Sequence, residues 1–104
     1  EFLRIPVRLA LSFSGDRVRG EGILVDISMG GCLIHSQMSV RVDDILYLRI
    51  SLAEQSPPLE LAAMVRSVGA RGIGFKFLRA AREDKRLAEV LQAQGRDTTR
   101  RPPA

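Results

Sequence analysis

The strongest constraint on the fold is an alternation of apolar and polar residues that fills the first three quarters of the chain. Such alternation is typical of β-strands with one buried face, because successive side chains of a strand point to opposite sides. Six short stretches of this kind are separated by turn residues, and they span 5–13, 23–27, 32–35, 45–52, 59–68 and 72–78. The sequence therefore predicts an all-β fold, a six-stranded antiparallel barrel with split, Greek-key-like connections.

The phase of the alternation also predicts which side chains fill the barrel. The predicted inward residues are Ile5, Val7, Leu9, Leu11, Phe13, Ile23, Val25, Ile27, Leu46, Leu48, Ile50, Leu52, Ile73, Phe75 and Phe77. Tyr47 falls on the other face of its stretch, and we expect it to pack on the barrel with its hydroxyl in water.

After the strands the period changes to that of a helix, from Arg82 to Gln94. One stripe of this helix carries Leu87, Val90 and Leu91. Gly95 is a suitable stop signal. We therefore expect one domain over residues 1–95, a barrel closed by a C-terminal helix, and a disordered basic tail or linker over 96–104.

Length and composition exclude several classes of protein. A chain of 104 residues suits a single domain, and it contains no apolar run of the roughly 18–20 residues that a membrane-spanning helix requires. Cys32 and His35 are the only residues of their types, so no disulfide framework, zinc cluster or catalytic triad is expected. The chain is predicted to be a non-catalytic, cofactor-free domain without direct membrane insertion. We expect it in the cytoplasm, alone or as the cytoplasmic domain of a membrane-associated protein.

The basic character of the chain comes mainly from arginine. The net charge is +4, and 14 of the 16 basic residues are arginines. Arginine suits planar, bidentate recognition of phosphates and bases, although a GC-rich genome also favours its codons. Binding to a nucleic-acid polymer is disfavoured, because such sites use exposed aromatic platforms and Phe13, Phe75 and Phe77 are all predicted to point inward.

One predicted turn carries residues suited to a ligand, the segment Asp26-Ile27-Ser28-Met29-Gly30-Gly31. The Asp26 carboxylate can accept hydrogen bonds from N–H donors, or it can orient an arginine. The Ser28 hydroxyl can close the turn or donate to a phosphate. Gly30 and Gly31 allow positive φ and close backbone approach. Asp and Ser before Gly-Gly are also common in plain hairpin turns, where they bond to their own backbone.

This D-x-S-x-x-G segment follows an arginine-bearing start, Arg4-Ile5-Pro6-Val7-Arg8. Together with the six strands, the closing helix and the Gly72–Phe75 segment, the two motifs resemble the PilZ domain family, bacterial receptors for the second messenger cyclic di-GMP. The family pattern is R-x-x-x-R followed by D/N-x-S-x-x-G. The resemblance extends over about residues 1–91.

Two registers are open for the arginine motif. Arg4 and Arg8 match R-x-x-x-R literally. In the family, however, the second arginine usually comes just before a V/I-P-V strand opening, which favours Arg4 as the second arginine and places the first one residue before Glu1. Arg8 would then lie in the strand and flank the ligand, and binding by this chain would be weaker than by a longer one. Arg66 is a further candidate that could reach the ligand from the side.

The resemblance implies a regulatory domain of a larger protein that binds cyclic di-GMP through Arg4, Arg8, Asp26, Ser28, Gly30, Gly31 and Arg66. The implied partner is a neighbouring domain or effector protein, with a polysaccharide synthase, a motility brake and a stand-alone adaptor all open. The alternative is a degenerate domain of the same fold that acts through protein contacts without a ligand.

Overall fold

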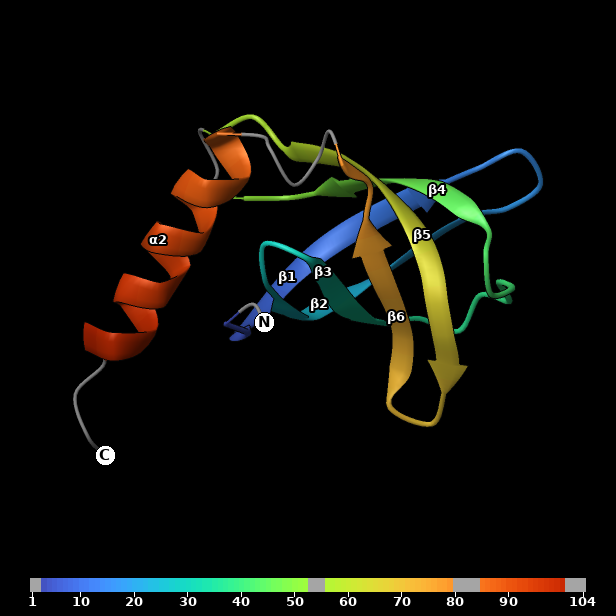
Figure 1. The fold of residues 1–104 in the computed structure, drawn as a ribbon, viewed down its shortest axis with the longest axis horizontal. Coiled ribbons are helices and arrows are strands. Elements are labelled where there is room, and N and C mark those ends of the chain that lie inside the picture. Colours follow the sequence, from blue (N-terminus) through green and yellow to red (C-terminus); the bar gives the residue numbers. More distant parts are fainter. Residues whose placement is uncertain (1–2, 53–55, 80–84, 101–104) are drawn as a thin grey trace.

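The protein is described by a computed structural model, which places residues 3–52, 56–79 and 85–100. Six antiparallel strands form a closed barrel with a helix beside it (Figure 1). The elements are β1 (Ile5–Ser14), β2 (Arg19–Ile27), β3 (Gly31–His35), β4 (Ile45–Ile50), β5 (Leu59–Gly69), β6 (Gly72–Phe77) and α2 (Lys85–Arg100). The predicted fold class, an antiparallel six-stranded barrel with one helix, is confirmed.

The strand order around the barrel is β1-β2-β3-β6-β5-β4, and pairing of β1 with β4 closes the ring. Hairpins join β1 to β2, β2 to β3, β4 to β5, and β5 to β6, whereas β3 pairs with β6 from a distant part of the chain. In a ring of six, strands three places apart lie on opposite sides. As a result, β2 lies across the barrel from β5.

The interior is filled by the residues that alternation predicts on β1, β4 and β6. Phe13, Phe77, Leu46, Leu48 and Ile50 are at most 1% exposed. The earlier inward residues of β1 are only partly buried and pack against this core.

The phase of β2 differs from the prediction. Its core residues are Leu24 and Ile27, 0% and 1% exposed, while Ile23 and Val25 are only half-buried. The pairing with β3 passes from Leu24–Ile34 directly to Asp26–Leu33, so β2 has one extra residue at this point. This β-bulge shifts the inward face by one residue. The prediction that Ile23 and Val25 belong to the core is therefore wrong.

Two other expectations on the strands need correction. Tyr47 is not packed on the barrel, because 66% of it is exposed. The strand predicted at 23–27 begins earlier, at Arg19. Its first four residues, Arg-Gly-Glu-Gly, show no apolar alternation, and they become a strand because they pair with β1.

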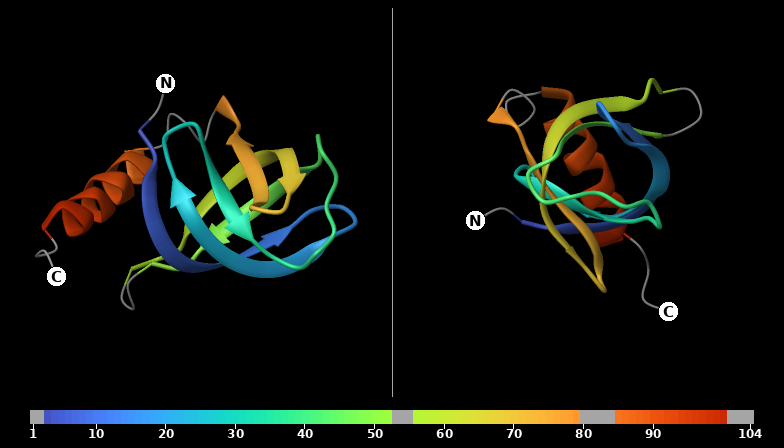
Figure 2. Two further views of the ribbon diagram at one scale, coloured as in Figure 1. Left: turned by 90° about the horizontal axis from the view of Figure 1, so that it is seen from below. Right: turned by 90° about the vertical axis from the view of Figure 1, so that its right-hand side faces the viewer.

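The helix α2 lies across one open end of the barrel and contacts β1 there (Figure 2). The predicted stripe of Leu87, Val90 and Leu91 is buried. The Arg86 guanidinium also donates hydrogen bonds to the carbonyls of Pro57 and Pro58, at 2.5 and 2.8 Å.

The predicted stop at Gly95 is wrong, because α2 continues to Arg100. A glycine inside a helix costs only about 1 kcal/mol, so it does not by itself end one. Residues 96–100, expected in a disordered tail, continue the helix. The remaining tail, 101–104, and the predicted helix start at Arg82 lie outside the described residues.

The bulge in β2 is tested by substitution of neighbouring residues. We expect Leu24→Ala to lower the free energy of unfolding by about 2–5 kcal/mol, because it leaves a cavity in the core. Val25→Ala should cost less than about 1.5 kcal/mol, since Val25 is only half-buried. Urea unfolding of both variants measures the difference, and the reverse ranking would restore the unbroken alternation.

Candidate functional site

Arg4 and Asp26, predicted to converge, are in contact. The pairing of Pro6 with Asp26 brings the start of β1 alongside the end of β2. There an Arg4 Nη1 hydrogen donates to the Asp26 carboxylate, with side chains that are 57% and 23% exposed. An ion pair with this much exposure contributes only about 0–1 kcal/mol to stability. A ligand can therefore replace it at little cost to the fold.

The Ser28 hydroxyl closes the turn that follows β2. It accepts hydrogen bonds from the N–H groups of Gly30 and Gly31, at 3.1 and 3.2 Å, and lies 3.3 Å from the Gly31 carbonyl, to which it donates. Ser28 is 3% exposed and is the buried polar side chain among the described residues. Of the two uses expected for this hydroxyl, the structure shows the turn-closing one.

The two glycines of the turn serve the barrel. Neither has a positive φ, so that expectation is wrong. The expected close approach occurs at Gly31, where a Cβ atom would lie 2.0 Å from the carbonyl oxygen of Phe75 on β6. The Gly30 carbonyl accepts a hydrogen bond of 2.8 Å from the Phe77 N–H. The Gly-Gly corner therefore holds β3 against β6.

The other two predicted arginines, Arg8 and Arg66, lie at different distances from the Arg4–Asp26 pair. Arg8 is exposed on β1, beside the irregular pairing between Pro6 and Leu9, and so lies one strand from Asp26. Arg66 is exposed on β5, with β3 and β6 between it and β2. Three strand spacings amount to about 14 Å. Arg8 thus lies one strand from Asp26, and Arg66 lies three strands from it.

Two residues in the same row across the sheet as Asp26 were missed by the sequence analysis. Leu33 on β3 is paired with Asp26, and Gly74 on β6 is paired with Leu33. The bulge in β2 sets the register that pairs Asp26 with Leu33. Alternation in the sequence does not reveal the bulge. The signal that could have found Gly74 is its place between the inward residues Ile73 and Phe75, which makes it outward-facing.

Cys32 is paired with Ile27, the residue after Asp26, and is fully buried. Burial raises the pKa of its thiol well above the usual range. The Asp26 carboxylate raises this pKa further, and Arg4 opposes part of the effect. The thiol therefore stays neutral and is a poor nucleophile.

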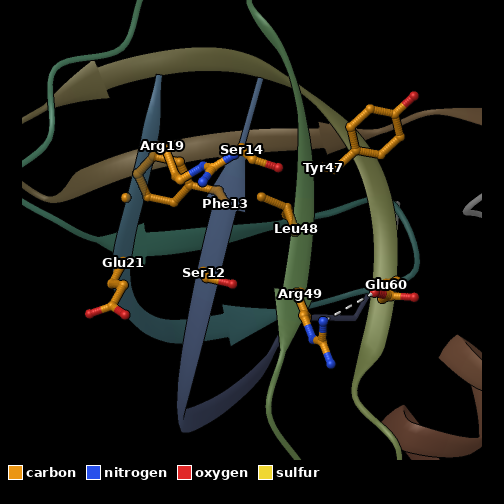
Figure 3. Close-up of a pocket in the computed structure, with 10 residues that line it drawn as sticks. Ser12, Phe13, Ser14, Arg19, Glu21, Tyr47, Leu48, Arg49 and Glu60 are labelled. Carbon is orange, nitrogen blue, oxygen red and sulfur yellow. Dashed lines mark ion pairs between the residues drawn. The ribbon is translucent and has the colours of Figure 1, made fainter. Parts of the chain in front are cut away.

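A separate groove of about 550 Å³ lies over β1, between β2 and β4 (Figure 3). Ser12 and Ser14 contribute to its floor, and Arg49 at its edge turns toward Glu60, 3.9 Å away. Tyr47 at its rim is the exposed aromatic residue of the described chain. None of the predicted ligand residues lines this groove.

A model of the PilZ domain family matches residues 1–93, most of the chain. No curated protein matches the sequence.

Several solved structures share the fold. The PilZ domain of CeSA from a cellulose-synthesizing bacterium has a TM-score of 0.66 at 18% identity, over 89% of this chain and 95% of that one. The PilZ domain of YcgR from Escherichia coli, solved with cyclic di-GMP, has a TM-score of 0.66 at 16% identity, over 97% of each chain. A second YcgR structure in complex with cyclic di-GMP has a TM-score of 0.70 at 15% identity, over 94% of this chain and 48% of that one.

The structural role of the Gly-Gly corner is open to a direct test. We expect Gly31→Ala to lower the free energy of unfolding by about 1–3 kcal/mol or more, because its methyl group would overlap a backbone carbonyl that cannot rotate away. Gly69→Ala is the matched control, since a Cβ there meets nothing within 4 Å. Thermal and urea unfolding provide the measurement, and equal stability of the two variants would contradict the close approach.

The raised pKa of Cys32 predicts a dependence of stability on pH. Above about pH 8.5 the thiol of the unfolded chain ionises, while the folded one keeps its proton. The unfolded state is then favoured, and this group lowers the free energy of unfolding by about 1.4 kcal/mol per pH unit. Urea unfolding between pH 7 and 10 should show this slope, and Cys32→Ala should lack that part of it. Parallel slopes would mean that the thiol is not held neutral.

Proposed function

The chain belongs to the PilZ domain family, and on that premise we propose that it is a non-catalytic receptor domain for cyclic di-GMP within a larger protein. The observation that carries the proposal is the contact between Arg4 and Asp26. It joins an arginine at the start of β1 to the acidic residue of the D-x-S-x-x-G motif, from positions 22 residues apart. The family membership and the fold shared with ligand-bound PilZ structures support the same reading.

The exposed atoms of this pair match the chemistry of the ligand. Cyclic di-GMP presents two phosphates and two guanines. The Asp26 carboxylate can accept from the N1–H and N2 amino donors of a guanine, while Arg4 can donate in bidentate fashion to a phosphate or to guanine O6 and N7. We infer that ligand binding exchanges the Arg4–Asp26 ion pair for these contacts. Arg8, one strand away, adds a cation on the same flank.

In this proposal Ser28 and the two glycines of the motif act indirectly. Ser28, Gly30 and Gly31 hold the turn through their mutual hydrogen bonds and through β6. They position Asp26 and leave its carboxylate accessible. Arg66 lies beyond β3 and β6 from Asp26, so it has no part in positioning the Arg4–Asp26 pair.

The position of the site suggests how binding reaches the rest of the protein. Arg4 immediately precedes β1, and β1 contacts α2. A ligand that fixes Arg4 and its neighbours favours one arrangement of the leading segment over others, and only such a differential contact can shift a conformational equilibrium. The partner that responds to this change would be a neighbouring domain or an effector protein.

A second candidate function is supported by a different surface. Ile45 and Tyr47 on β4 are 45% and 66% exposed, and they pair with Met64 and Ala62 on β5. Such an apolar face suits a protein contact, as expected for a domain that acts without a ligand. The residue before Glu1 in the native protein discriminates: an arginine favours ligand binding, and an acidic or apolar residue favours the silent form.

We propose a cytoplasmic location, where a receptor for a bacterial second messenger is expected. Among the helices that the structure describes, none has the length and apolar character to cross a bilayer.

Calorimetric titration with cyclic di-GMP tests the proposed function. We expect Arg4→Ala and Asp26→Ala each to weaken binding by about 10- to 100-fold, because each removes charge-assisted hydrogen bonds of about 1.5–3 kcal/mol. Arg17→Ala is the matched control, since Arg17 is an exposed arginine in the hairpin at the far end of β1. All three variants should unfold within about 1 kcal/mol of the parent.

Two results would count against the receptor function. One is the absence of binding at high micromolar ligand by a version of the protein that includes the residues preceding Glu1. The other is an affinity that Arg17→Ala lowers as much as Arg4→Ala does, which would indicate attraction by overall charge.

A further inference from the structure

Gly74 occupies a position where a glycine weakens the fold. It lies inside β6, and its neighbours Ile73 and Phe75 point into the core at 3% and 4% exposure. Gly74 therefore faces outward on a paired strand. A glycine in a strand interior loses conformational entropy on folding and packs nothing, so its presence requires a reason.

Neither backbone conformation nor packing supplies that reason. Gly74 does not have a positive φ, unlike Gly72 at +127°. A Cβ atom at position 74 would meet the Ser67 hydroxyl oxygen at 2.5 Å and nothing else closer than 3.8 Å. A serine hydroxyl can rotate away, whereas the backbone carbonyl that confronts Gly31 cannot. The barrel can therefore accept a side chain at position 74 at low cost.

The bare backbone of Gly74 lies in one row with the candidate site. Asp26 on β2 is paired with Leu33 on β3, and Leu33 is paired with Gly74 on β6. Leu33 is half-buried on the outer face of the barrel. Beyond the Asp26 carboxylate, the surface thus consists of one apolar side chain and then the partly exposed backbone of Gly74. This row extends over two strand spacings, or about 10 Å. We call Leu33 and Gly74 the shelf.

We propose that the shelf is the seat of one purine ring of the ligand, which lies flat on Leu33 and Gly74 with its hydrogen-bonding edge at Asp26. The inference rests on the proposed function and names the residues that select a planar base. Apolar contact beneath a ring and a few placed polar groups at its edge are the usual means of holding such a ligand. A side chain at position 74 would lift the ring and draw its edge away from Asp26.

Substitution of Gly74 separates ligand binding from stability. We expect Gly74→Val to weaken cyclic di-GMP binding at least tenfold, with a melting temperature unchanged or higher because valine favours strands. Gly69→Val is the matched control, with nothing within 4 Å of its Cβ, and it should bind like the parent. Should Gly74→Val not fold, Gly74→Ala is measured in its place, with the same direction of effect expected.

A second readout observes the contact itself. A purine that lies on Leu33 shifts the methyl proton signals of that leucine upfield through its ring current. In methyl spectra of the parent protein saturated with cyclic di-GMP, the Leu33 methyls should show this shift, and it should be absent in Gly74→Val at the same occupancy.

The outcomes distinguish the shelf from the receptor function. Binding by the parent that Gly74→Val or Gly74→Ala leaves unchanged, or saturation without a shift of the Leu33 methyls, would overturn the shelf and leave the receptor function standing. No binding by the parent, extended upstream of Glu1, would overturn both.

Discussion

The contact between the Gly31 backbone and the Phe75 carbonyl is the constraint on which the rest of the structure depends. β3 and β6 are far apart in the sequence, and their pairing, together with that of β1 and β4, joins two sets of hairpins into a ring. At Gly31 the two backbones lie too close for any side chain. The turn after β2 is consequently held between its own serine hydroxyl and a distant strand. The turn therefore fixes the position of Asp26, the last outward-facing residue before it.

The D-x-S-x-x-G motif divides into two physical roles. Ser28 and Gly31 are buried, and their polar atoms are satisfied within the turn, so they stabilise the corner. Asp26 is partly exposed, and within the described part of the chain its carboxylate is bound by one exposed side chain, that of Arg4. In such an arrangement the turn stays folded when no ligand is bound. The polar atoms that a ligand would contact, those of Arg4 and Asp26, contribute little to the stability of the fold.

The fold was predictable from the sequence because most strands obey simple alternation. The inward residues of β1, β4 and β6 were identified correctly, and so was the buried stripe of α2. Errors occurred where non-local pairing overrides the local pattern. Because of the bulge in β2, Leu24 points into the core in place of Val25. At the other end of the chain, Gly95 does not end the helix. Tyr47 was misplaced because its strand face has no covering layer in the described part of the chain.

The sequence by itself determined the class of fold, the closing helix and the family, since these depend on periodicity and on short motifs read along the chain. Tertiary structure decided which candidate residues lie close together. Arg4 meets Asp26 because of the register between β1 and β2, whereas Arg66 is carried to the opposite side by the order of strands around the barrel. Gly74 comes into line with Asp26 by the same means. Strand order and register arise from contacts between distant segments, and local patterns do not encode them one residue at a time.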